Sequence, residues 1–194
     1  MEYLFLFLVC SLAVLVQSIT GFGSNVVMMA LLPTFLSTFT STAVADFSGF
    51  FTALLLGRKY FRKANFKLIA VPLCFFLAVS TFCVFLSVSA PDELLSKGLG
   101  AILILLSLYF LFFQQKARLK PNFWTGMAMG ILSGVTGGFF AMAGPPMVLY
   151  ILSCTDDHEE YLGTLQFYFI IVSSFTFFLR LLSGAFSSEL LLMN

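Results

Sequence analysis

Six long apolar stretches, separated by short polar connections, make up most of this chain. They cover approximately residues 3–37, 40–57, 67–89, 94–113, 123–153 and 161–182. A helix that crosses a lipid bilayer needs about 20 consecutive, mostly apolar residues. The pattern therefore predicts an all-α polytopic membrane protein.

The first and fifth stretches are longer than one straight crossing requires, and glycine interrupts each of them. The interruptions are Gln17–Asn25 and Gly134–Pro146, and a further proline, Pro33, follows the first one. Lipid cannot satisfy the backbone groups that such a break frees, so a break persists only where protein or water covers it. Each stretch is therefore either a discontinuous helix or a span followed by a re-entrant half-helix.

The composition supports a membrane protein and argues against most enzymes. Hydrophobic residues make up 60% of the 194, charged residues only 10%, and the mean hydropathy is +1.02, which excludes an ordinary soluble domain. Protease motifs and nucleotide-binding loops are absent from the sequence. Four cysteines are scattered without close pairing, as small buried hydrophobes would be: Cys10, Cys74, Cys83 and Cys154. We therefore expect no catalytic residue, no metal and no cofactor.

Basic residues are concentrated in two connections, residues 58–67 and 114–121. The connections 91–93 and 156–160 are acidic instead. Lys and Arg near the ends of membrane spans mark the cytoplasmic side. We therefore expect loops 58–67 and 114–121 in the cytoplasm and the two acidic connections outside. Beside a membrane span, this explanation of the basic cluster is preferred to nucleic-acid binding.

The two interrupted stretches occupy corresponding places in two halves of the chain. When the second break is laid on the first, these pairs coincide: Gly23 with Gly144, Val27 with Val148, Leu31 with Leu152, and Thr34 with Thr155. Paired interruptions in two half-sequences point to the substrate site of a transporter. We expect a first transmembrane repeat at 1–121 and a second, incomplete repeat at 122–194 that lacks about two terminal spans.

The breaks provide the candidate site. A short helix is expected to begin near Ser24 and another near Pro145, and a helix N-terminus exposes unpaired N–H groups that suit an anion. The candidate substrate-binding residues are Gly21, Gly23, Ser24, Asn25, Gly138, Gly144, Met147 and Gln166. The alternative is that the small residues only let helices pack closely.

Three further polar residues lie within apolar stretches. An ionised Asp46 inside a span must face protein or water, so it binds a coupling proton or cation, pairs with a cation of another segment, or reaches the headgroups. Gln17 is expected to hydrogen-bond a neighbouring helix, and Arg180 to extend to the cytoplasmic face. His158, which lies among four acidic residues, is expected in a solvated loop rather than a metal site.

At the breaks the chain resembles the sulfite exporter TauE/SafE family of bacterial membrane permeases. The similar segments are Gln17–Gly23, Gly130–Gly138, Gly144–Pro146 and Leu162–Tyr168. The resemblance implies a helical carrier of two related halves that moves sulfur oxyanions such as sulfite, or small organosulfonates, across the cytoplasmic membrane. The glycine runs of the family are usually denser than Gly21-Phe-Gly23.

Members of that family also usually have more spans than the six predicted here. The alternatives are therefore a truncated or split-gene membrane subunit without transport activity of its own, which needs a partner for the missing spans, and a carrier for another small organic anion. The expected partners are the lipid bilayer and a small anionic solute, with no nucleic acid.

Overall fold

The computed structural model describes residues 2–112 and 120–184, and all regular structure in these residues is helical. The α-helices are α1 (Glu2–Thr20), α2 (Ser24–Leu31), α3 (Thr38–Gly57), α4 (Phe66–Ser89), α5 (Asp92–Phe112), α6 (Phe123–Phe140), α7 (Gly144–Cys154) and α8 (His158–Leu182). Two short 3-10 helices, η1 (Leu32–Thr34) and η2 (Phe61–Lys63), lie in the connections before and after α3.

Three of these helices, α3, α4 and α8, are long and apolar enough to cross a membrane. Large apolar side chains are also exposed on the outside of the bundle. Such a surface is favourable in contact with lipid and unfavourable in contact with water. The all-α membrane fold predicted from the sequence is confirmed. Each uninterrupted apolar stretch coincides with one helix, apart from a few residues at its ends.

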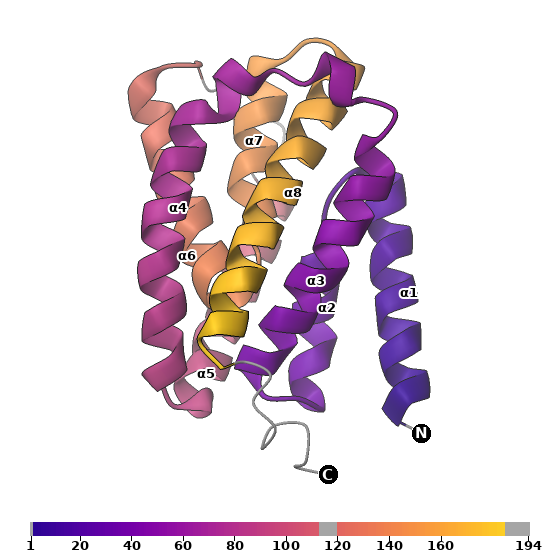
Figure 1. The fold of residues 1–194 in the computed structure, drawn as a ribbon, viewed down its shortest axis with the longest axis vertical. Helices are drawn as coiled ribbons and strands as arrows, with labels where there is room; N and C mark the ends of the chain where they lie inside the picture. Colours follow the sequence, from indigo (N-terminus) through magenta and orange to yellow (C-terminus); the bar gives the residue numbers. More distant parts are fainter. Residues whose placement is uncertain (1, 113–119, 185–194) are drawn as a thin grey trace.

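Each interrupted stretch forms a helical hairpin rather than one long discontinuous helix. Figure 1 shows α2 returning beside the lower part of α1, and α7 returning beside α6. The first reversal needs glycine, because Gly21 and Gly23 have φ values of 81° and 99°, which side chains disfavour. The second is made at Ala141, which adopts the left-handed conformation with a φ of 56°. We call α1–α2 the first hairpin and α6–α7 the second.

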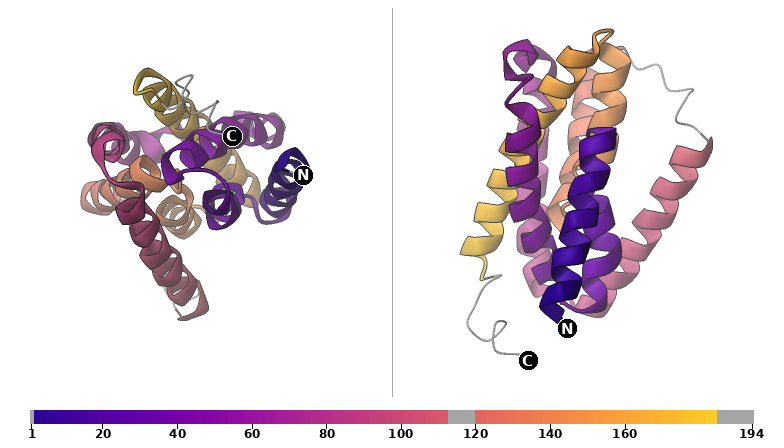
Figure 2. Two further views of the ribbon diagram at one scale, coloured as in Figure 1. Left: turned by 90° about the horizontal axis from the view of Figure 1, so that it is seen from below. Right: turned by 90° about the vertical axis from the view of Figure 1, so that its right-hand side faces the viewer.

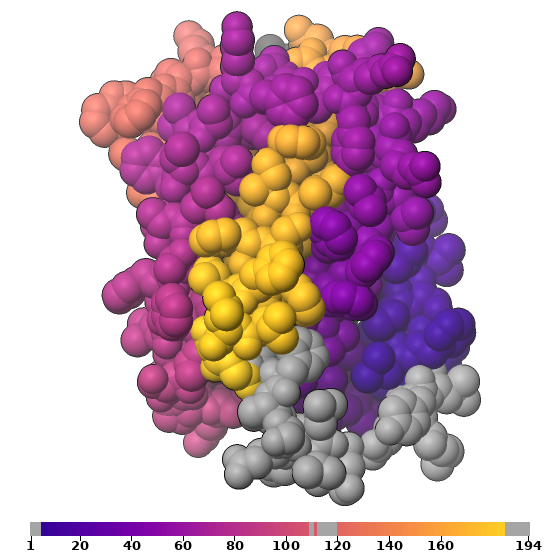
Figure 3. Space-filling model, in the orientation of Figure 1, coloured from indigo at the N-terminus to yellow at the C-terminus, as the bar shows by residue number. Residues whose placement is uncertain are grey.

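The long helices α3 and α8 lie side by side on the face of the bundle seen in Figure 1. α3 and α8 pack against each other along their lengths, and α4 packs along α6 (Figure 1). In the space-filling view, the side chains of α8 fill the space between α4 and α3 (Figure 3). α5 leans away from the rest of the bundle (Figure 2). The half-helix α2 packs against α3, and the half-helix α7 packs against α8.

Glycine allows α4 and α6 to approach closely. Gly126, Gly130, Gly134 and Gly138 repeat every fourth residue, so they share one face of α6. A Cβ atom at Gly130 would lie 2.4 Å from the carbonyl oxygen of Pro72 in α4. These glycines therefore serve close helix packing, which was the alternative explanation for the small residues of this stretch.

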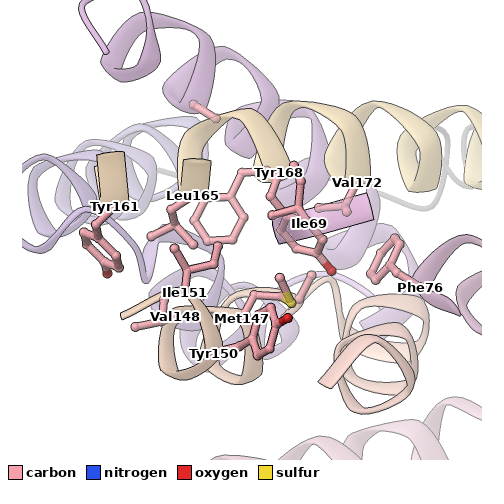
Figure 4. Packing of buried hydrophobic residues seen from close by; sticks show 13 residues of the cluster. Ile69, Phe76, Met147, Val148, Tyr150, Ile151, Tyr161, Leu165, Tyr168 and Val172 are labelled. Atoms are coloured by element: carbon pink, nitrogen blue, oxygen red, sulfur yellow. The ribbon is translucent and has the colours of Figure 1, made fainter. Parts of the chain in front are cut away.

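A cluster of buried apolar side chains holds α7 against α8 and α4 (Figure 4). Met147 and Ile151 of α7 are fully buried there, next to Leu165 and Tyr168 of α8. The hydroxyl oxygens of Tyr168 and Ser133 in α6 lie 2.8 Å apart. Ser133 also donates to the carbonyl oxygen of Ala143, at 2.6 Å, so this cluster fixes where α7 begins.

The basic connection 58–67 and the acidic connection 156–160 lie at the same end of the bundle. The Lys63 ammonium is 3.0 Å from a carboxylate oxygen of Glu159, and the Asn65 amide donates to Glu160 at 2.8 Å. The hydrogen bond to Glu159, with the charges of Glu159 and Asp157, raises the pKa of Lys63.

The prediction that these two connections face opposite sides of the membrane is therefore wrong. The reason is the second hairpin, because α7 returns to the end at which α6 began. The other acidic connection, 91–93, lies at the opposite end, where Asp92 accepts from the backbone N–H of Thr38 at 2.7 Å. Most of the predicted cytoplasmic loop 114–121 lies outside the described residues.

The boundaries of the helices in the two halves correspond. α1 ends at Thr20 and α6 at Phe140; α2 begins at Ser24 and α7 at Gly144; α3 begins at Thr38 and α8 at His158. In each pair the second boundary follows the first by 120 residues (140 less 20, 144 less 24, 158 less 38). Both halves thus follow the order hairpin, then long helix.

Candidate functional site

A small cavity lies where the two hairpins meet α3 and α8. Its volume is about 30 Å³, and both hairpins, α3, α4 and α8 contribute to its wall. A water molecule needs roughly 10–15 Å³ of such space, so the cavity has room for about two water molecules. The lining includes Gly23, Ser24, Asn25, Asp46, Ala141 and Gly144.

Two half-helices begin at this cavity, α2 at Ser24 and α7 at Gly144. Neither has a side-chain cap, because the N-cap residues are Gly23 and Ala143. The first N–H groups of a helix have no partner within the helix and carry partial positive charge. Both helices thus direct positive ends at the same cavity.

The two helix ends offer different donors. α2 begins with Ser24 and Asn25, which add a hydroxyl and an amide to the backbone N–H groups. α7 continues from Gly144 into Pro145 and Pro146, which have no N–H. Most donors at the cavity therefore come from the first hairpin.

A buried amide and hydroxyl network supports the start of α2. The Ser24 hydroxyl donates to the side-chain carbonyl of Gln17, and the Gln17 amide donates to Gln166 of α8 at 3.3 Å. The Gln166 amide in turn donates to the carbonyl oxygen of Gly21 at 2.6 Å. Gln17 thus bonds a neighbouring helix, as predicted, and α8 is tied to the turn of the first hairpin.

Asn25 connects the two hairpins directly. Its amide donates to the carbonyl oxygen of Ala141, in the turn of the second hairpin, at 2.8 Å. Gly49 of α3 provides the space, since a Cβ atom there would lie 2.8 Å from the Asn25 side-chain oxygen. Asn25 therefore both lines the cavity and holds its two sides together.

A buried ion pair lies behind one wall of the cavity. Arg180 of α8 donates from Nε to a carboxylate oxygen of Asp46 in α3 at 2.9 Å, and both side chains are buried. Nη2 of Arg180 donates to the carbonyl oxygens of Gly137 at 3.0 Å and Gly138 at 2.7 Å. Nη1 has no acceptor among the described residues. One guanidinium thus joins α3, α6 and α8.

Five of the nine candidate residues line the cavity, namely Gly23, Ser24, Asn25, Gly144 and Asp46. The other four lie outside its lining. Gly21 and Gln166 belong to the hydrogen-bond network of the first hairpin, Gly138 packs against α4 and bonds Arg180, and Met147 lies in the apolar core.

Sequence reasoning missed Arg180, Ser173 and Thr176 of α8, and also the turn residue Ala141. Arg180 was expected to extend to the cytoplasmic face, which is wrong, because it is fully buried against Asp46. The sequence did indicate the pairing of Arg180 with Asp46, since a cation and an acid inside apolar spans are expected to pair. Ala141, Ser173 and Thr176 carry no comparable pattern, because the tertiary structure brings them together.

Near His158, the described residues contain no group of three or more side chains that could hold a metal ion. The imidazole stacks on Tyr161, with ring centroids 6.2 Å apart. His158 begins α8 at the polar end of the bundle, where the sequence placed a solvated loop.

Helical hairpins, long apolar helices and a buried polar cavity together define a polytopic helical membrane protein built around a small polar site. The sequence model of the family described as "Sulfite exporter TauE/SafE" matches residues 6–193. The chain therefore belongs to this family of membrane permeases, and the resemblance seen in the sequence is confirmed. Comparison with curated proteins finds no match. Comparison with solved structures finds none either.

Proposed function

We propose that this chain is a permease for small anions, and that sulfite and related sulfur oxyanions or organosulfonates are its solutes. The observation that carries the proposal is the meeting of two uncapped helix N-termini, at Ser24 and Gly144, on one cavity between two hairpins. Half-helix ends of this kind hold anionic groups in membrane carriers.

The chemistry of the cavity favours a compact, oxygen-rich anion. The first N–H groups of α2 and the second amide hydrogen of Asn25 are hydrogen-bond donors on one side of the cavity, and the Ser24 hydroxyl adds a third kind of donor when it exchanges Gln17 for the anion. A volume of about 30 Å³ leaves no room for a nucleotide or a sugar. Sulfite, with one sulfur and three oxygens, matches the donors, and the walls need to separate only slightly to admit it.

We also propose that the first repeat, 1–121, and the second, 122–194, are related halves facing each other across this site. The shared spacing of the helix boundaries supports this arrangement. We assign the end that carries connection 58–67 to the cytoplasm. Acidic residues contribute little to the positive-inside rule, so the acidic connection at the same end does not oppose the assignment.

Uptake of radiolabelled sulfite into proteoliposomes tests the function. The full chain should give saturable uptake that empty liposomes lack. Asn25→Asp keeps the shape of the side chain but adds a negative charge at the donors, so uptake should fall at least about tenfold. The matched control is Asn122→Asp, at the N-cap of α6 away from the cavity, where Asp serves as well as Asn.

Uptake by the Asn25→Asp protein equal to that of the Asn122→Asp control would contradict the assignment of this cavity. Competition with unlabelled thiosulfate, a small organosulfonate and a small carboxylate then ranks the solutes. Stronger competition by the carboxylate than by either sulfur anion would indicate a carrier for another organic anion.

A further inference from the structure

The proposed anion site does not explain the buried ion pair between α3 and α8, which also contacts the end of α6. Asp46 is the one charged residue among those that line the cavity, and a carboxylate there opposes an anion. Asp46 is 2% exposed, so water does not screen its charge. A cavity that receives anions therefore needs a counter-charge close to Asp46.

Arg180 supplies that counter-charge from behind the wall. Its Nε contacts the Asp46 carboxylate, and Arg180 is 0% exposed. A guanidinium stays protonated in proteins, so the counter-charge is permanent. Ser173 and Thr176, the polar residues that α8 contributes to the lining, are uncharged and cannot replace the counter-charge of Arg180.

Arg180 also covers a second source of negative potential. The last carbonyl groups of a helix carry partial negative charge, and α6 ends at the cavity. The guanidinium binds two of these carbonyls, those of Gly137 and Gly138. At the first hairpin, the carbonyl of Gly21, just after the end of α1, accepts from the neutral amide of Gln166.

We infer that Arg180 is the positioning residue that makes this cavity selective for anions, by neutralising Asp46 and the carboxyl-terminal end of α6. The inference rests on the proposed function. Asp46 then serves as the partner of Arg180, and not as a free site for a coupling cation. The anion touches the donors of α2, while Arg180 acts through Asp46.

The test is the concentration dependence of sulfite uptake by three variants. Arg180→Gln leaves the Asp46 carboxylate uncompensated, so KM for sulfite should rise at least about tenfold. Asp46→Asn leaves the guanidinium uncompensated, so KM should fall or stay unchanged. The double variant Asp46→Asn/Arg180→Gln removes both charges, so KM should return to within about threefold of the wild type.

A purely structural ion pair gives a different pattern. Both single variants would then raise KM or lose protein alike, because breaking a buried pair from either side is destabilising. A KM that rises in Asp46→Asn as much as in Arg180→Gln would overturn the inference. A double variant as impaired as Arg180→Gln would overturn it too.

Two controls keep these results interpretable. Lys97 and Glu93 form an exposed pair at 2.7 Å, and Glu93→Gln, Lys97→Gln and their double variant should leave KM unchanged. If Arg180→Gln yields no folded protein, Asp46→Asn and the double variant are each compared with the wild type, and a KM raised at least about tenfold in either would overturn the inference. Absence of saturable sulfite uptake by the wild type would contradict the proposed function itself; normal wild-type uptake with the wrong pattern among the variants contradicts only the role of Arg180.

Discussion

The two hairpins have the same architecture and different chemistry. The first turns at two glycines with positive φ and presents Ser24 and Asn25 to the cavity. The second turns at Ala141, begins its half-helix with prolines, and has its carbonyl groups covered by Arg180. The first hairpin therefore supplies donors, and the second supplies carbonyl groups that accept from Arg180.

The two hairpins also differ in how they pack against the rest of the bundle. α6 presents a face of glycines to α4, so the second hairpin is held closely in the bundle. α1 exposes Leu8, Leu12, Leu15 and Ile19 to the outside instead. The two hairpins thus need not carry equal roles, and substitutions that act on one hairpin alone can separate those roles.

The largest expected effect is on the packing of the second hairpin. In Gly130→Ala the new methyl group would overlap the backbone of Pro72, whose carbonyl oxygen is 2.4 Å away. Backbone cannot move aside as a side chain does, so the free energy of unfolding should fall by about 3 kcal/mol, the upper part of the usual range for overpacking.

Thermal unfolding in detergent measures this effect. The control is Gly100→Ala in α5, where a Cβ atom would meet nothing within 4 Å. Alanine favours a helix interior by about 1 kcal/mol, so this variant should be as stable as the wild type or more so. Equal stability of the two variants would show that α4 and α6 are not in close contact.

An intermediate effect on stability is expected from substitutions in the turns of the two hairpins. Gly23→Ala places a side chain at a φ of 99° with no clash, since the nearest atom would be 3.8 Å away. The cost should be about 1–2 kcal/mol of unfolding free energy from the backbone conformation alone. Ala141→Gly relieves the same kind of strain in the second hairpin, so stability should be unchanged or raised by up to about 1 kcal/mol.

Denaturant titration of both proteins checks this pair. The prediction is that Gly23→Ala lowers the free energy of unfolding and that Ala141→Gly does not. The size of each change depends on how far each turn relaxes. A Gly23→Ala protein as stable as the wild type, or an Ala141→Gly protein that is clearly weakened, would contradict the difference drawn between the turns.

The smallest expected effect concerns the contact between connections 58–67 and 156–160. The pKa of Lys63 is raised by Glu159, so its stabilising contribution is present below the ordinary lysine pKa and is lost as the pH rises through the raised value. Both partners are about half exposed, so solvent screens them. Lys63→Gln should leave the melting temperature near pH 7 unchanged within error; a clear drop would give this contact a structural role.

Much of the fold was predictable from the sequence, since the apolar stretches coincide with the helices and the glycine breaks with the hairpin turns. The half-helices were predicted to begin near Ser24 and Pro145, and they begin at Ser24 and Gly144. The direction of α7 was not predictable, because the same glycine and proline pattern fits a helix that continues and one that returns. The side assigned to connection 156–160 failed for that reason.

The charged pair required the tertiary structure. Asp46 and Arg180 are 134 residues apart, and only the packing of α3 on α8 brings them together. Local patterns also could not separate the glycines that serve packing, such as Gly138, from those that shape the cavity, such as Gly23.

The central claim is that one anion is held between the starts of α2 and α7. Selenite has the shape and charge chemistry of sulfite, and its selenium atom can be located by anomalous X-ray diffraction from crystals of the wild-type protein. We predict one selenium site between Asn25 and Gly144, within hydrogen-bonding reach of the Asn25 amide through a selenite oxygen. Selenium bound elsewhere, with this cavity empty at saturating selenite, would contradict the account.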